Sequence, residues 1–258
     1  MRITSAVEIL ENPKKFPSDR KNYKLIKLEN GLKALLIKKQ GNCKDIEHND
    51  TISYVALCID VGSFEDPFEV QGLCHFLEHM VFMGSEKFPK ENEFDQYIKS
   101  RNGFDNAMTE CEFTIFYFKV DTEHLHGALE RFANFFISPL MSLESMFREM
   151  EAVESEFQNN VNNDVHRVNQ LFASMVRDTH PASYFTWGNH KTLKTDIALK
   201  DLYFIVHEFR KRFYKSNRMN LCIQTSLGLE AQQRMKNVLR QVKNEEAKNV
   251  YDIYPAND

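Results

Sequence analysis

The chain has 258 residues, of which 42% are hydrophobic and 27% are charged, a composition typical of a globular protein with a sizeable core. The net charge of −4 argues against a nucleic-acid binder, which would usually show a basic face. We see no secretory signal in the N-terminal segment and no apolar run as long as a membrane-spanning helix, so we expect no membrane insertion. The five cysteines are scattered and form no Cys-x-x-Cys pair, which indicates free thiols in a reducing compartment and predicts a cytoplasmic protein.

Several segments have the alternating or β-branched pattern of strands. Two such runs flank Asn30 and Gly31, and an Asn-Gly pair in this setting is a strong signal for a hairpin turn. Residues 51–61 are long, β-branched and apolar, which predicts a buried strand. The other predicted strands span 103–110, 112–120 and 219–226.

The spacing of apolar residues predicts helices in the remaining segments. Phe94 and Ile98, for example, lie four residues apart and therefore share one helix face. Asp121 or Thr122 is placed to cap a helix that Pro139 ends. The predicted helices span 73–83, 88–100, 121–139, 142–161, 164–177, 201–214 and, as a closing surface helix, 228–246.

This mixture of elements predicts an α+β fold with a mixed, largely antiparallel sheet packed against several helices. We find no linker, internal repeat or low-complexity tract. The predicted organisation is an N-terminal extension over 1–22, one domain over 23–246 and a C-terminal tail over 247–258.

The segment "HFLEHMVFMGS", residues 75–85, contains the main candidate site. His75 and His79 are four residues apart, so on a helix their rings lie on one face and can converge on one metal ion. The pattern His-x-x-Glu-His is the inverted form of the zinc-protease motif, in which the glutamate, here Glu78, is the general base. The alternative is an amphipathic helix whose two histidines only hydrogen-bond to neighbours.

A zinc site needs a third protein ligand, and the acidic helix at 142–161 offers candidates. Glu149 and Glu156 are two helical turns apart and lie at the edge of the apolar stripe, so one or both could point inward. A buried carboxylate needs a cation as its partner. Glu151 and Glu154 are expected on the solvated surface of the same helix.

Three segments, "HFLEHMVFMGS", "NAMTECE" and "REMEAVESEFQNN", together resemble the insulysin/nardilysin branch of the pitrilysin family of inverted-motif zinc metallopeptidases. The resemblance extends from about residue 23 to about residue 239, and "TECE" and "FTWGN" are closer to the nardilysin side of that branch. It implies the fold of that family's N-terminal catalytic domain.

The resemblance also implies roles for individual residues. His75, His79 and Glu156 match the three ligands of one Zn²⁺ ion, and Glu78 matches the catalytic base that activates a zinc-bound water. Glu149 matches a second carboxylate that supports the catalytic site.

Asn106 and Ala107 match positions on a sheet edge that hold the substrate backbone. The implied function is a zinc metalloendopeptidase that hydrolyses oligopeptides, with the preference of nardilysin-like enzymes for pairs of basic residues. Members of this branch are much longer, so this chain covers only their first domain. The alternative is therefore a truncated, weakly active or inactive module of the same family. Such a module would bind peptides, or would pair with another copy or with a chain supplying the missing domains.

Overall fold

The computed structural model of the chain describes residues 7–38, 51–229 and 236–244. Its strands are β1 (Glu8–Ile9), β2 (Asn22–Lys27), β3 (Lys33–Lys38), β4 (Ile52–Ile59), β5 (Phe104–Thr109), β6 (Thr114–Asp121) and β7 (Met219–Thr225). They form one sheet in the order β1-β2-β3-β7-β4-β6-β5. Among these strands only β3 and β7 pair in parallel. The last of the described strands, β7, thus lies inside the sheet between β3 and β4, and β5 forms one edge.

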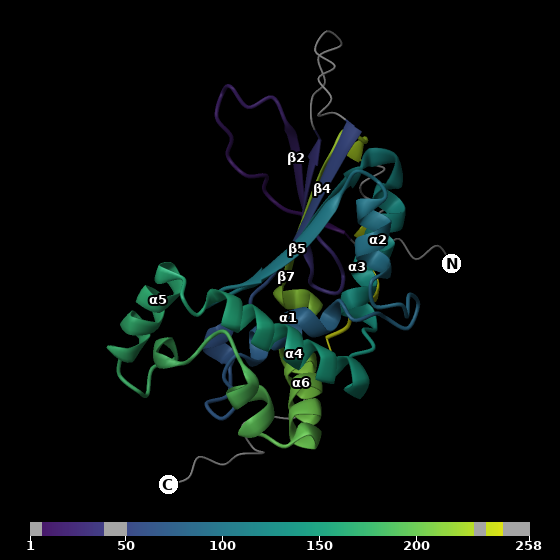
Figure 1. Ribbon diagram of the computed structural model, residues 1–258. Coiled ribbons are helices and arrows are strands. Elements are labelled where there is room, and N and C mark those ends of the chain that lie inside the picture. The colour runs from purple at the N-terminus through teal and green to yellow at the C-terminus, as the bar shows by residue number, and fades with distance from the viewer. Residues whose placement is uncertain (1–6, 39–50, 230–235, 245–258) are drawn as a thin grey trace.

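Helices cover one end and one side of this sheet (Figure 1). The α-helices of the described part are α1 (Leu73–Val81), α2 (Glu93–Lys99), α3 (Leu125–Ile137), α4 (Leu143–Asn160), α5 (Asp164–Ser174) and α6 (Leu199–Phe213). Helix α1 contacts β5, α4 and α6, whereas α2 and α3 pack on β5 and β6. In Figure 1, α5 projects away from the sheet at the far end of α4. This arrangement sets α1 between the edge strand β5 and the long helix α4.

The core follows from the two-residue period of the strands. Alternate residues of β6 are buried, and its Phe116 and Phe118 point toward α3. Phe132 of α3 lies 5.1 Å from Phe118 between ring centroids, and Phe136 lies 5.2 Å from Phe116. Their ring planes meet at 61° and 75°, the edge-to-face arrangement that aromatic pairs favour. This aromatic layer attaches the helices to the sheet beside the candidate site.

The predicted α+β class and the largely antiparallel sheet are confirmed. Strand β1 was not predicted; it lies in the expected N-terminal extension and pairs with β2. The helix expected from 121 begins as a 3₁₀ turn (Thr122–His124), and α3 follows without a side-chain cap. Of the expected closing helix over 228–246, the structure describes Leu229 as helical and Lys236–Gln241 as a 3₁₀ helix; residues 230–235 lie outside the described ranges. The boundaries of the domain stay predictions, and the predicted tail lies outside the described residues. No helix in the described ranges is long and apolar enough to cross a membrane.

Candidate metal centre and active site

Helix α1 carries the histidines, and a buried carboxylate fixes where it begins. The side chain of Asp66 is 3% exposed and accepts hydrogen bonds from the backbone N–H groups of Gly72 and Cys74, both at 2.8 Å. These N–H groups belong to the first turn, where no helix carbonyl can accept them. Burial raises the pKa of Asp66 to about 8, although the accepted hydrogen bonds act in the opposite direction. Asp66 therefore anchors the end of α1 from which His75 projects.

Each histidine is oriented through its Nδ1 atom. Nδ1 of His75 lies 2.6 Å from the backbone oxygen of Trp187, and Nδ1 of His79 lies 3.1 Å from Oε2 of Glu149. A carbonyl and a carboxylate only accept hydrogen bonds, so in both rings Nδ1 donates. The lone pair of the neutral ring then resides on Nε2, the atom left free to bind a metal ion.

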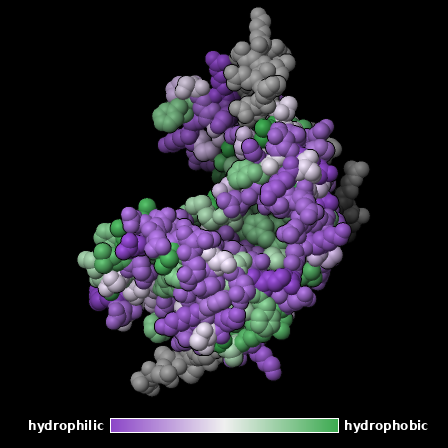
Figure 2. Space-filling view, in the orientation of Figure 1, coloured by the Kyte–Doolittle hydropathy of each residue, from purple (hydrophilic) through white to green (hydrophobic). Residues whose placement is uncertain are grey.

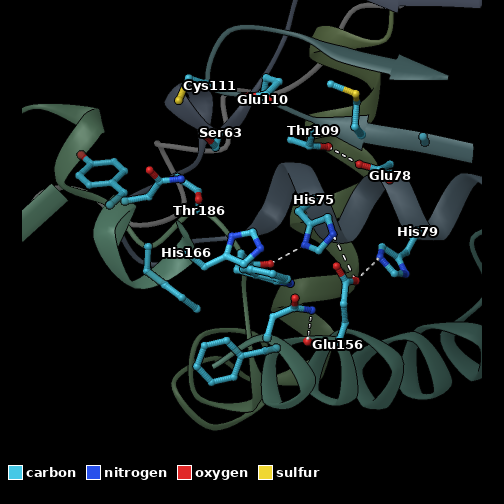
Figure 3. A pocket seen from close by; sticks show the side chains of 18 of the residues that line it. Ser63, His75, Glu78, His79, Thr109, Glu110, Cys111, Glu156, His166 and Thr186 are labelled. Carbon is cyan, nitrogen blue, oxygen red and sulfur yellow. Dashed lines mark hydrogen bonds and ion pairs between the residues drawn. The ribbon is translucent and has the colours of Figure 1, made fainter. Parts of the chain in front are cut away.

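Both Nε2 atoms face Glu156 of α4. Its Oε2 lies 3.6 Å from Nε2 of His75 and 3.4 Å from Nε2 of His79. One potential ligand atom from each of these three residues lies within 4.8 Å of the others. Figure 3 shows the two rings, from α1, meeting the Glu156 carboxylate across the gap between α1 and α4. Two segments 81 residues apart (156 − 75) thus supply one compact donor set.

The charges around this donor set differ from one residue to the next. Burial and the neighbouring His79 lower the pKa of His75. For His79, burial alone would lower the pKa, but hydrogen bonds to Glu149 and Glu156 outweigh burial and raise it to about 9. The hydrogen bond from His79 lowers the pKa of Glu156. The two carboxylates therefore favour a positive charge at this point.

Glu78 lies on α1 beside the two histidines, and its carboxyl group points toward the sheet edge. Its side chain is 8% exposed, and Oε2 accepts a 2.6 Å hydrogen bond from the hydroxyl of Thr109, the last residue of β5. Burial raises the pKa of Glu78, and the Thr109 hydroxyl partly offsets this effect. The result is a carboxyl group more basic than an exposed glutamate, as a proton acceptor in catalysis requires.

A cleft of about 1270 Å³ connects these groups with the edge of the sheet. The donor set, Glu78 and the β5 residues Asn106 and Ala107 all line it. In the described part of the chain β5 pairs only with β6, so one row of its backbone N–H and C=O groups faces away from the sheet. Figure 2 shows the molecule hollowed between the sheet and the α5 region, with apolar residues in the hollow.

The structure brings the predicted site residues together around one cleft. His75, His79 and Glu156 lie together, with Glu149 behind His79 and Glu78 on the same helix, while Asn106 and Ala107 line the same cleft. The prediction that Glu154 is solvated is wrong. Its side chain is 19% exposed and accepts a 2.7 Å hydrogen bond from the N–H of His190. Glu151, at 57% exposure, does lie at the surface.

Sequence reasoning gave no role to three residues that shape the site: Asp66, Thr109 and Trp187. Asp66 stands six residues before Gly72, outside the spacing of an ordinary helix cap. Thr109 and Trp187 are 31 and 112 residues from their partners Glu78 and His75, so no local pattern connects them. The segment "FTWGN" was the only sequence signal near Trp187, and it came from the family resemblance.

The chain belongs to the insulinase family of peptidases, family M16, whose family model matches residues 45–184, more than half of the chain. Human (Homo sapiens) nardilysin is 36% identical over 84% of this chain. Mouse (Mus musculus) insulin-degrading enzyme is 40% identical over 92% of this chain. The crystal structure of pitrilysin superposes with a TM-score of 0.84 at 31% identity and covers 95% of this chain. These similarities confirm the predicted family and its insulysin/nardilysin branch.

The chain spans about a quarter of the length of these relatives. It covers 25% of human nardilysin, 22% of mouse insulin-degrading enzyme and 25% of the pitrilysin chain.

The donor set fits a zinc ion. Two imidazole nitrogens and one carboxylate oxygen are the ligand types of catalytic zinc sites, which keep a further position for water or substrate. Both histidines also have the oriented Nδ1–H group that is usual for metal-binding histidines, donated here to Trp187 and Glu149.

Proposed function

We propose that this domain is a zinc-dependent metalloendopeptidase that cleaves peptide bonds within oligopeptides. The observation that carries the proposal is the convergence of His75, His79 and Glu156 next to the buried carboxyl group of Glu78. When bound there, Zn²⁺ would supply Lewis-acid chemistry, making water more acidic and polarising a carbonyl group. Family membership supports a peptidase, and the donor set supports zinc as its metal.

Glu78 is the proposed general base and acid. It takes the proton from the attacking water and delivers it to the nitrogen of the leaving amine, so that the peptide C–N bond breaks. Two features support this role: burial raises the pKa of Glu78, and the hydroxyl of Thr109 fixes its carboxyl group at the end of β5. Glu149 acts on catalysis through His79, to which its carboxylate is bonded.

The proposed substrate is an extended peptide that adds to β5 as a further strand. Asn106 and Ala107 would bind its backbone through the outward-facing N–H and C=O groups of the edge. The same strand ends at Thr109, which holds Glu78, so a peptide paired along β5 would pass the proposed base. Recognition of this kind depends on an available backbone, which favours unfolded peptides.

A second element of the proposal is a preference for basic side chains, as in pairs of basic residues. Among the described residues that line the cleft outside the proposed zinc site, two carboxyl groups, Asp105 and Glu110, stand against one basic side chain, Arg167. Such a cleft attracts cationic peptides. We assign the contact with a basic substrate side chain to Asp105. It precedes Ala107 by two residues, so both side chains lie on the same face of β5. Its Oδ1 atom is buried without a hydrogen-bond partner among the described residues.

The decisive experiment measures cleavage of a fluorogenic peptide containing two adjacent basic residues, together with the zinc content of the purified chain. We expect one zinc per chain and measurable turnover. Glu78→Gln should retain zinc and lose about 10²- to 10⁴-fold in turnover, and Glu156→Gln should lose zinc. Glu144→Gln is the matched control, since Glu144 lies on α4 with an 86% exposed side chain.

The outcomes separate the parts of the proposal. Absence of zinc from the wild-type chain would contradict it entirely. Zinc bound without turnover would show that the isolated chain needs a partner, either a second copy or a chain supplying the domains present in the longer relatives. Adding that partner should then restore cleavage in wild type but not in Glu78→Gln.

A further inference from the structure

Trp187 is the one tryptophan of the chain and lies against the candidate metal centre. It follows the 3₁₀ turn Pro181–Ser183, in an irregular segment that reaches back to α1. Its ring centroid lies 6.3 Å from that of His75 and 4.4 Å from that of His166, both in edge-to-face contacts. The residue therefore contacts one proposed ligand through its ring, in addition to its backbone.

The backbone of Trp187 is fixed by a crossing of two glycines. Gly72 and Gly188 both have positive φ angles, +87° and +79°, which side chains other than glycine rarely adopt. A Cβ atom on Gly72 would lie 2.2 Å from Cα of Gly188 and 2.8 Å from the carbonyl carbon of Trp187. The approach therefore requires glycine at 72, whereas at 188 a Cβ atom would lie 3.3 Å from Gly72 and the positive φ favours glycine. The approach brings the Trp187 oxygen to 2.6 Å from Nδ1 of His75.

The indole of Trp187 presents a second polar group to the site. Its Nε1 atom is buried, and no hydrogen bond of ordinary geometry satisfies it in the described part of the chain. A buried indole N–H normally has an acceptor. The indole ring lies against the His75 ring, whose Nε2 atom is 3.6 Å from Oε2 of Glu156, so the buried donor is close to that carboxylate. A small movement of the Glu156 side chain, such as binding a cation requires, would complete the bond.

We propose that Trp187 is a positioning residue that orients two ligands at once. Its carbonyl oxygen holds the His75 ring with Nε2 toward the ion, and its indole N–H donates to the Glu156 oxygen that does not bind the ion. The inference rests on the proposed zinc site. Partners of this kind fix ligand orientation, and their loss typically weakens metal binding by about 10- to 100-fold.

The first test uses the wild-type chain and Zn²⁺ alone, followed by nitrogen-15 NMR. A single tryptophan gives a single indole N–H resonance, which should move downfield in proportion to one bound Zn²⁺. Before zinc is added, the His75 ring should show the Nδ1–H tautomer. An indole resonance that does not move, or an Nε2–H tautomer at His75, would overturn the corresponding half of the inference.

The second test measures zinc affinity by competition with a chelating dye. This measurement also works for a variant that lacks Trp187. Trp187→Phe keeps the carbonyl and an aromatic ring but removes the N–H, and should weaken zinc binding about 10- to 100-fold. Gly188→Ala disturbs the close approach of Gly72 and Gly188 and should also weaken zinc binding. Phe172→Leu, at an exposed position of α5, is the control and should not change affinity. Unfolding curves without metal verify that each variant is folded.

An affinity within about twofold of wild type for folded Trp187→Phe would overturn the role of the indole. Wild-type chain that binds no zinc would overturn the proposed function together with this inference. If the wild-type chain binds zinc and cleaves peptide, and Trp187→Phe binds zinc with the same affinity, only this inference would be overturned.

Discussion

Glu78 and Glu156 are two carboxyl groups of one small site, and their surroundings move their pKa values in opposite directions. Burial raises the pKa of Glu78, whereas the hydrogen bond from His79 lowers that of Glu156. Carboxyl groups whose pKa values are separated in this way commonly have different tasks. The lowered pKa favours the ionised form of Glu156 that the proposed metal ligand needs, and the raised pKa of Glu78 favours the proposed exchange of a proton.

The hydroxyl of Thr109 is expected to matter for turnover. Thr109→Val removes the 2.6 Å hydrogen bond to Glu78 while preserving the shape of the side chain. A hydrogen bond to a charged group contributes about 1.5–3 kcal/mol, so kcat should fall about 10- to 100-fold. Thr109→Ser restores the hydroxyl and should recover most of the activity. Zinc content should be the same in all three chains; full activity in the valine variant would contradict the prediction.

Asp105 should make the proposed preference for basic substrates depend on pH. Burial and the neighbouring Asp95 raise its pKa to about 6, and Lys99 acts against them. Above pH 6 the carboxylate is ionised and attracts a cationic side chain, and this attraction is lost as the pH falls through about 6. The ratio of kcat/KM for a lysine peptide to that for its norleucine analogue, measured from pH 5 to 8, should rise with pH. In Asp105→Asn the ratio should be lower and should not rise with pH. An unchanged rise would show that another group causes the pH dependence.

At the scale of single elements, α1 depends on a cap from outside the helix. Asp66→Ala would leave the buried N–H groups of Gly72 and Cys74 without their acceptor. An unpaired buried donor costs about 1–3 kcal/mol, so with two such donors the free energy of unfolding should fall by about 2–6 kcal/mol. Zinc affinity should fall too, because α1 carries two proposed ligands.

Denaturant unfolding and zinc competition measure both effects. Asn163→Ala on α5 is the control, because it removes a 2.9 Å cap bond to Val165 from a helix that carries no proposed ligand. It should destabilise the chain by about 1 kcal/mol and leave zinc affinity unchanged. Equal effects of both variants on zinc binding would contradict the special role of Asp66.

Elements that depend on local pattern were predictable from sequence. The turn at Asn30 and Gly31 and the two-residue period of β6 gave strands close to the observed bounds. The four-residue spacing of His75 and His79 likewise gave the face of α1 that meets α4. These features are set within one turn or one strand.

Features that depend on distant partners were not predictable. Glu154 looks like a surface residue within its helix, yet the His190 segment packs over it. Strand β1 has only two residues, too few for a sequence pattern, and is a strand because it pairs with β2. The crossing of Gly72 and Gly188 brings together residues 116 positions apart (188 − 72). The periodicity of the sequence indicates which face of an element is apolar. It does not indicate which distant segment packs against that element.

For the whole molecule, removing the metal should lower thermal stability. A zinc ion at His75, His79 and Glu156 would connect α1 to α4, so binding at about 100 times Kd should add about 2.7 kcal/mol. For a domain of this size, the melting temperature should fall by roughly 5–10 °C in EDTA. Differential scanning fluorimetry measures the shift. Glu156→Gln should show almost none, and an EDTA-insensitive wild type would contradict a metal shared by the two helices.

The place of β7 in the sheet has a consequence for how the protein is made. Strands β3 and β4 do not pair with each other; each pairs with β7, which leaves the ribosome after the other described strands of this sheet. Before Met219–Thr225 emerges, the nascent chain can form only two separate groups of strands. Joining them requires contacts distant in sequence, which form slowly. Assembly of the continuous sheet is therefore delayed until translation has passed Thr225, so the nascent chain would complete this sheet only after the residues of the candidate site had been synthesised.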